Sequence, residues 1–139
     1  MSTNDTPMSF DDIDVSNVQA AAAFSNPPSG QFLVLVTMSQ KLVNEKRAVV
    51  VDFELQEVIE LGTQHTELTA EPGQKFNALY FVDKPERIPY VKRDLAAFLD
   101  AIGTQSINTM VAAVQAMPAK IVWSYDRNDY ARVLSYQIV

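Results

Sequence analysis

The residues with the clearest chemical potential lie in the last segment, 120–139, which reads KIVWSYDRNDYARVLSYQIV. It holds the only tryptophan, Trp123, three of the five tyrosines and two arginines. Aromatic rings stack on nucleic-acid bases at about 1–3 kcal/mol per base, and basic residues follow the phosphate backbone. These residue types therefore predict a surface for single-stranded nucleic acid. Burial in a core is the competing interpretation for each ring.

The spacing of these residues decides which rings share a face. Alternation predicts two strands joined by a turn at 126–129, with Trp123 and Tyr125 on one face of the first strand. Tyr130, Arg132 and Tyr136 share one face of the second strand by the same rule. The opposite face of the first strand is too polar for a core. That favours an inward position for Trp123 and leaves open which rings stack.

Basic residues fall in the predicted turns and strands, where a nucleic-acid backbone could be contacted. The charged turn at 44–47 carries Lys46 and Arg47, and the strand at 74–82 carries Lys75 and Tyr80. Acidic residues in the same turns partly offset this positive charge. The predicted nucleic-acid site consists of Lys46, Arg47, Lys75, Tyr80, Trp123, Tyr125, Arg127, Arg132 and Tyr136. Four more basic residues at 84–95 are interpreted as a solvated loop and helix start, with a second phosphate contact as the alternative, because basic charge near a helix N-terminus is unfavourable.

The elements that must position this site follow from hydrophobic periodicity. Alternating or β-branched segments at 32–43, 48–61 and 74–82 predict three strands, and a phase slip at 56–57 predicts a β-bulge. Apolar stripes predict a helix from Pro89 to a stop at Gly103 and a second helix, capped by Ser106, up to Pro118. The order β-β-β-α-α-β-β is that of the OB-fold, a five-stranded Greek-key barrel with inserted helices.

Composition divides the chain into two parts. Residues 1–40 contain four aspartates and no lysine or arginine, and the net charge of the chain is −6. We expect residues 1–29 to be a flexible acidic leader, with room for one short helix at 15–24, and residues 30–139 to be one OB-fold domain. The acidic balance argues against coating nucleic acid by bulk charge.

The sequence offers no constellation for catalysis. There is no cysteine, and His65 is the only histidine, so no metal site is expected. No glycine-rich phosphate loop or nucleophile motif occurs, and Asp52 and Glu54 are spaced as solvent-facing strand residues. We therefore expect a protein that is not an enzyme and uses no cofactor. Neither a secretory signal nor a membrane span is expected.

Three segments resemble a known group of proteins. GQFLVLVTMSQKLVNEKRAVVVDFELQEVIELG, PGQKFNALYFVD and RDLAAFLDAIG are similar to bacteriophage single-stranded-DNA-binding proteins of OB-fold type. The matching positions are Gly30, Gly73, Lys75, Leu95, Phe98, Leu99, Ala101 and Gly103. The resemblance spans about residues 30–139 and implies sequence-independent binding of single-stranded DNA in phage replication or recombination, in the host cytoplasm.

The chain departs from that group at its end. Many such proteins end in a flexible acidic tail, whereas this chain ends in an apolar strand and has its acidic segment at the N-terminus. We expect this leader to contact replication or recombination proteins and to compete with DNA. A homodimer through edge strands is a further expectation. The alternative function is a protein–protein adaptor or a virion-associated structural protein on the same fold.

Deleting residues 1–24 is then expected to tighten the binding of short oligonucleotides, because an acidic competitor is removed. Titration of a labelled oligonucleotide with the full chain and with the truncated chain measures the change. Equal affinities would contradict the role of the leader.

Overall fold

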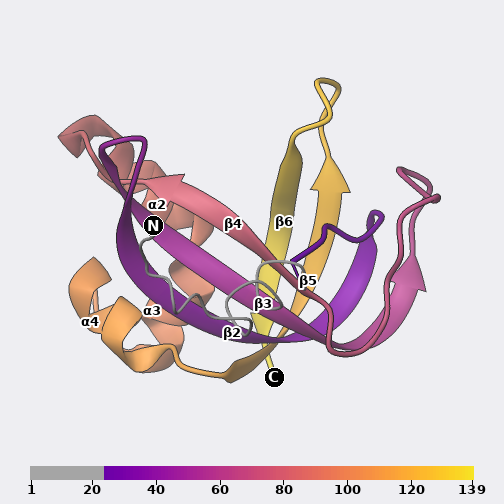
Figure 1. Ribbon diagram of the computed structural model, residues 1–139. Coiled ribbons are helices and arrows are strands. Elements are labelled where there is room, and N and C mark those ends of the chain that lie inside the picture. Colours follow the sequence, from indigo (N-terminus) through magenta and orange to yellow (C-terminus); the bar gives the residue numbers. More distant parts are fainter. Residues whose placement is uncertain (1–23) are drawn as a thin grey trace, which may run out of the picture.

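The computed structural model describes residues 24–139, so most of the predicted leader lies outside the described residues. Five strands form one antiparallel sheet in the order β4-β3-β2-β5-β6 (Figure 1). The strands are β2 (Gly30–Val43), β3 (Lys46–Leu61), β4 (Lys75–Phe81), β5 (Met117–Tyr125) and β6 (Ala131–Ile138). Between β4 and β5 lie η1 (Pro85–Arg87), α2 (Ile88–Asp94), α3 (Ala96–Ile102) and α4 (Ile107–Ala113).

The sheet curls into an open, barrel-like shape without closing (Figure 1). Strands β4 and β6 are its two edges and do not pair through their backbones. They approach each other where the hydroxyl oxygens of Tyr80 and Tyr136 lie 2.7 Å apart. The prediction of a mainly β fold with five strands and inserted helices is therefore confirmed. The finer prediction of an OB-fold is compatible with this open sheet and stays a prediction.

The core lies on the concave face of the sheet, where the alternating apolar residues of every strand meet. Its centre is a cluster of rings from three strands, with the Phe76 and Trp123 centroids 4.8 Å apart and those of Phe53 and Phe76 5.1 Å apart. Phe53 and Trp123 meet edge to face at 6.1 Å. Edge-to-face rings at these distances contribute beyond their area burial. This cluster therefore joins β3, β4 and β5 at the middle of the sheet.

Register shifts interrupt the alternation in two strands. On β3, Gln56 and Ile59 are skipped in the pairing with β2, which confirms the irregularity predicted near 56–57. On β6, Val133 pairs with Trp123 and Ser135 with Val122, so Leu134 is skipped. Because of this extra residue, the residues of β6 after Leu134 face the side opposite to the one that strict alternation predicts.

The bulge at Leu134 overturns one prediction. Tyr136 does not share a face with Tyr130 and Arg132: it packs its ring on Phe98, with centroids 5.0 Å apart, on the concave side. Arg132 points outward and is exposed. Strict alternation failed because one inserted residue shifts a period-2 pattern by half a period.

The helices cover one end of the concave face (Figure 1). The predicted helix at 89–103 divides into α2 and α3 at Leu95, whose φ of −105° and ψ of 18° leave the helical region while its side chain stays fully buried. Gly103, at φ +82°, ends α3 as predicted. Ser106 caps α4 by accepting a hydrogen bond from the Thr109 N–H at 3.2 Å, also as predicted.

Replacing Trp123 with alanine should reduce the free energy of unfolding by about 3–5 kcal/mol, because the ring cluster loses its largest member and a cavity remains. Urea denaturation followed by circular dichroism measures the change. The exposed Tyr130→Ala variant is the control and should stay within about 0.5 kcal/mol of wild type. A loss below about 1 kcal/mol in Trp123→Ala would contradict this description of the core.

Candidate nucleic-acid interface

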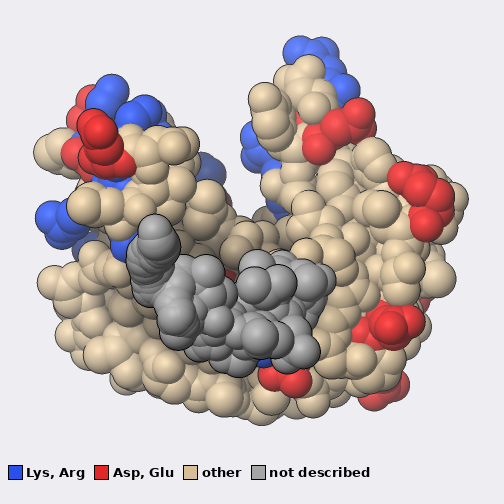
Figure 2. All heavy atoms as spheres, in the orientation of Figure 1, with Lys and Arg blue, Asp and Glu red and all other residues tan. Residues whose placement is uncertain are grey.

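A cleft opens between the two edge strands of the sheet. Its volume is about 540 Å³. We call it the edge cleft; its lining residues are Asn77, Ala78, Leu79, Tyr80, Asp94, Asp126, Tyr130, Ala131, Arg132 and Val133. Figure 2 shows a notch between two raised arms, with lysine and arginine side chains gathered near the top of each. One arm ends in the β2–β3 hairpin and the other in the β5–β6 hairpin (Figure 1).

The β2–β3 arm ends in a tight two-residue turn. Val43 pairs with Lys46, and the two residues between them, Asn44 and Glu45, have φ values of 52° and 66°. Two successive positive φ angles are the mark of the turn type that best matches the twist of a hairpin. Lys46 directly follows this turn and is exposed. The β2–β3 and β5–β6 hairpin turns point to the same side of the molecule (Figure 1).

The β5–β6 turn is held in one shape by Asp126. Its Oδ1 accepts hydrogen bonds from the N–H groups of Asn128 at 2.8 Å and Tyr130 at 3.1 Å, and its Oδ2 accepts one from Arg132 Nε at 3.2 Å. The backbone hydrogen bond from Tyr130 is the main cause of a lowered pKa of the Asp126 carboxyl; the Asn128 N–H and Arg132 lower it further, while desolvation opposes them. The turn is therefore pre-organised, and it presents Arg127 at its tip.

Tyr130 follows this turn and is 70 % exposed while lining the edge cleft. On the other side of the cleft, Asp94 is the last residue of α2. Tyr90 lies one helical turn before Asp94, hence on the same face of α2, and is 62 % exposed. The guanidinium carbon of Arg93 lies 5.3 Å from the centroid of the Tyr90 ring. Tyr130 thus lines the cleft on one side, and Tyr90 lies on the helix face that borders the other side, each with an arginine close by in the chain.

Tyr80 and Tyr136 lie at the base of the edge cleft. Burial raises the pKa of Tyr80 to about 12, against a smaller lowering by its hydrogen bond to Tyr136. Burial, then the charge and hydrogen bond of Tyr80, raise the pKa of Tyr136 well above its usual range. Both hydroxyls therefore stay neutral and joined to each other at ordinary pH. We assign this pair to holding β4 against β6 rather than to stacking on bases.

Two predicted stacking residues lie in the core. Trp123 is 1 % exposed and Tyr125 is 7 % exposed, so neither ring has a face open to a base. The Trp123 Nε1–H donates to the Tyr125 hydroxyl at 3.2 Å, and that hydroxyl donates to the carbonyl of Pro27. We therefore correct the stacking assignment of both: their polar atoms are satisfied inside the fold, as buried aromatic residues require.

The predicted basic residues do not gather at one place. Lys75 lies on the outer face of the sheet in a small hollow with Asp52 and Glu54, away from the concave side. Arg47 lies in a separate pocket beside the helices. Of the predicted site, Tyr80 and Arg132 line the edge cleft, and Lys46 and Arg127 lie beside the turns that end the two arms.

Sequence reasoning did not assign Tyr90 or Tyr130 to the site. Tyr130 was recognised only as a member of a strand face, although it directly follows the polar turn at 126–129, where exposure is expected. Tyr90 was interpreted as part of a solvated helix start. Its neighbour Arg93 was a usable signal, since an exposed aromatic beside an arginine is a common stacking arrangement.

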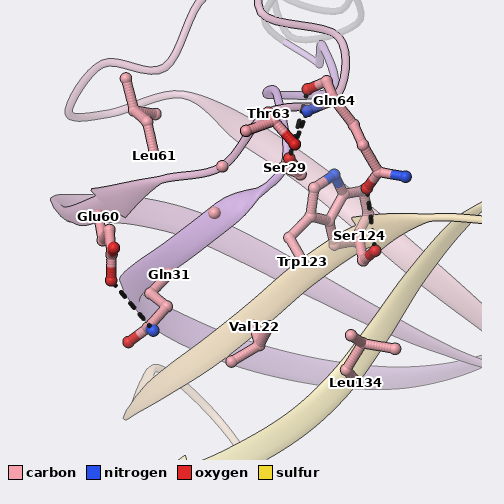
Figure 3. A pocket seen from close by; sticks show the side chains of 12 residues that line it. Ser29, Gln31, Glu60, Leu61, Thr63, Gln64, Val122, Trp123, Ser124 and Leu134 are labelled. Carbon is pink, nitrogen blue, oxygen red and sulfur yellow. Dashed lines mark hydrogen bonds between the residues drawn. The ribbon is translucent and has the colours of Figure 1, made fainter.

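A second hollow, of about 310 Å³, lies where β2, β5 and the residues after β3 meet (Figure 3). Gln64 crosses one side of it, accepting from the Ser124 hydroxyl at 3.0 Å and donating to the Tyr125 carbonyl at 2.7 Å. A Cβ added to Gly62 would lie 2.4 Å from the Ser29 hydroxyl oxygen, so glycine allows this close approach. One of the hydrogen bonds drawn in Figure 3, from the Gln64 N–H to the Ser29 hydroxyl oxygen at 3.0 Å, fastens the chain before β2 to the loop after β3.

Comparison with protein-family models, with curated proteins and with solved structures finds no match to this chain. Within residues 24–139, no three histidine, aspartate or glutamate side chains are grouped so that they could hold a metal ion. None of the helices in this same part of the chain has the length and apolar character that crossing a membrane requires.

The raised pKa of Tyr80 predicts a stability that falls at high pH. Between pH 10.0, its usual pKa, and about 12, the unfolded chain loses this proton and the folded chain keeps it. The free energy of unfolding should therefore decrease by about 1.4 kcal/mol per pH unit for this one group. Urea denaturation across this range should show a shallower decrease for Tyr80→Phe than for wild type. Parallel pH profiles would contradict the burial of this hydroxyl.

Proposed function

We propose that this protein binds single-stranded DNA without sequence preference in the edge cleft, as part of phage replication or recombination. The observation that carries the proposal is the exposed Tyr130 ring in the lining of the cleft, with the exposed Tyr90 on the face of α2 whose Asp94 lines the opposite side. Each has an arginine close to it in the chain, and Arg93 contacts the ring of Tyr90. Proteins that hold single strands combine stacking rings with cations in the same way.

The turn geometry supports this use of Tyr130. Asp126 fixes the loop from 126 to 130 by two hydrogen bonds to backbone N–H groups, so little conformational freedom remains to be lost on binding. Base stacking then contributes about 1–3 kcal/mol per ring and tolerates any sequence. The cation of Arg132 is already paired with Asp126 at 3.2 Å. Arg127 therefore becomes the main phosphate contact expected on this arm.

The charge of the chain limits how binding can work. With a net charge of −6, affinity must come from a local site and not from the protein as a whole. Arg132 lines the cleft, Arg127 lies at the tip of the adjoining turn and Arg93 lies beside the Tyr90 ring. With three phosphate contacts, a plot of the logarithm of the binding constant against the logarithm of the salt concentration should have a slope of about −2.

A second candidate function is favoured by the two edge strands. Within the described residues, β6 has no strand partner on its outer side, and β4 pairs on its outer side only through an isolated bridge between Lys75 and Phe24. An extended segment of another protein could pair with such an edge, as in adaptors that work by strand addition. The acidic net charge suits this alternative, a protein–protein adaptor or virion-associated component, and the same edges could join two copies of this chain.

Fluorescence anisotropy of a labelled oligo-dT at two salt concentrations tests the first function. We expect wild-type binding that weakens as salt rises, with Tyr130→Ala binding about 5-fold to 150-fold more weakly because one stacking ring is lost. Tyr130→Phe keeps the ring and should bind nearly as well as wild type. Because Trp123 is buried, its own fluorescence is a poor reporter of bound bases.

A matched pair of charge variants is the control for this experiment. Arg127→Gln and Lys75→Gln each remove one exposed positive charge, but Lys75 lies on the outer face. Only Arg127→Gln should reduce the salt dependence. Equal effects of both variants, or no wild-type binding at low salt, would rule out the edge cleft as the site. Light scattering of the wild type without DNA then tests for self-association through the edges.

A further inference from the structure

A second cationic site lies on the other side of α2 from the edge cleft. The inward-facing rows of β2 and β3 are apolar up to Met38 and Val49, and the inward positions beyond them are polar. The next inward positions are Gln40 on β2 and Arg47 on β3. They form a pocket with α2 and with the start of α4, which we call the helix pocket. Its lining residues are Gln40, Arg47, Val82, Ile88, Lys92, Gln105, Ser106, Ile107 and Asn108.

The charges of the helix pocket have one sign. Arg47 and Lys92 line it, and no aspartate or glutamate does. Neither cation forms an ion pair with any residue from 24 to 139. Of the other four arginines, Arg127 is also without an ion pair among the described residues, whereas three are paired: Arg87 with Asp83 at 3.8 Å, Arg93 with Asp94 at 3.3 Å and Arg132 with Asp126 at 3.2 Å. Two cations that share a pocket repel each other, and an anion between them removes that cost.

The polar groups around these cations are oriented as donors. Gln40 Nε2 donates to Asn108 Oδ1, which leaves the Asn108 amide N–H groups for another acceptor. The Ser106 hydroxyl oxygen accepts from the Thr109 N–H, so its proton is free to be donated. A ligand in the helix pocket therefore meets one guanidinium, one ammonium, one amide N–H₂ and one hydroxyl. This set suits an anion with several acceptor oxygens, since arginine binds phosphate bidentately.

The size of the helix pocket limits which ligands it can hold. Its volume is about 250 Å³, which lies below the roughly 300–1,000 Å³ typical of sites for drug-sized ligands. Val82, Ile88 and Ile107 supply an apolar side that a few carbon atoms could cover. The dimensions fit a phosphate group attached to a small organic part.

We propose that the helix pocket binds a terminal phosphate, the dianionic group of a phosphate monoester. The carrier is either a small phosphorylated molecule or the phosphorylated end of a nucleic-acid strand. This proposal does not rest on DNA binding in the edge cleft. Lys92 and Asp94, two positions apart on α2, point to different sides of that helix, one into each site.

Two probes separate a terminal phosphate from a backbone phosphate. Methyl phosphate is a monoester, dianionic well above its second pKa of about 6, and dimethyl phosphate is a diester with one charge. We expect methyl phosphate, at constant ionic strength, to cause saturable shifts in the backbone amide resonances of residues 105–108 of the full-length protein. Dimethyl phosphate should bind at least about tenfold more weakly.

Variants test whether the two cations are responsible. Lys92→Gln and Arg47→Gln should each weaken methyl phosphate binding at least about tenfold, since each removes one charge-assisted contact. The control is Lys41→Gln, which removes a charge from the neighbouring position on β2 without lining the pocket. The proposal is overturned by an absence of saturable shifts in the wild type, by equal binding of the diester, or by an equal effect of Lys41→Gln.

The carrier is identified with oligo-dT bearing either a 5′-phosphate or a 5′-hydroxyl group. Tighter binding of the phosphorylated strand, lost in Lys92→Gln, supports the phosphate site and makes a strand end the carrier. If methyl phosphate binds while the two oligonucleotides bind alike, the site is supported with a small molecule as carrier. Failure of oligo-dT binding in Tyr130→Ala concerns only the edge cleft, so the two proposals fail separately.

Discussion

The hydroxyl groups of Tyr80 and Tyr136 share a 2.7 Å hydrogen bond between two strands that have no backbone hydrogen bonds with each other. A five-stranded sheet that curls this far must either close or stabilise its edges in another way. Here the tyrosine pair and the ring cluster of Phe53, Phe76 and Trp123 hold the curvature from the concave side. Because the closure is made by side chains, β4 and β6 can separate beyond it, and that separation forms the edge cleft.

The same constraint explains how the two candidate sites are divided. The helices fill one end of the concave face, with Leu95, Phe98 and Met110 fully buried against the sheet. Polar positions that follow the buried rows, such as Arg47 and Gln40, are then left beside the helices, while Tyr130 and Arg132 remain beside the open edges. One chain thus presents a stacking surface on one side of α2 and a cationic pocket on the other.

Much of this architecture could be predicted from local patterns. Period-2 alternation predicted five strands, and Gly103 and Ser106 marked the end of one helix and the start of another, because these signals lie within a few residues. The outward or inward position of single rings was harder to predict. Lys75 lies on the outer face by simple alternation with the buried Phe76, which the strand pattern does contain. Tyr136, in contrast, faces inward because Leu134 is skipped in the register, and Arg47 lies in the pocket that β2 and β3 form with the helices. Both effects depend on pairing between distant segments, which local periodicity does not contain.

The bulge at Leu134 divides β6 into two halves whose inward-facing residues have opposite parity. After the bulge, Tyr136 and Ile138 belong to the packed interior, and their size and shape are limited by their neighbours. Before it, Ala131 and Val133 pack against the same interior, whereas Arg132 is exposed and hydrogen-bonded to Asp126. A single unpaired residue therefore moves the inward-facing row of β6 from odd-numbered to even-numbered residues, so Arg132 stays on the outside while Tyr136 packs inside.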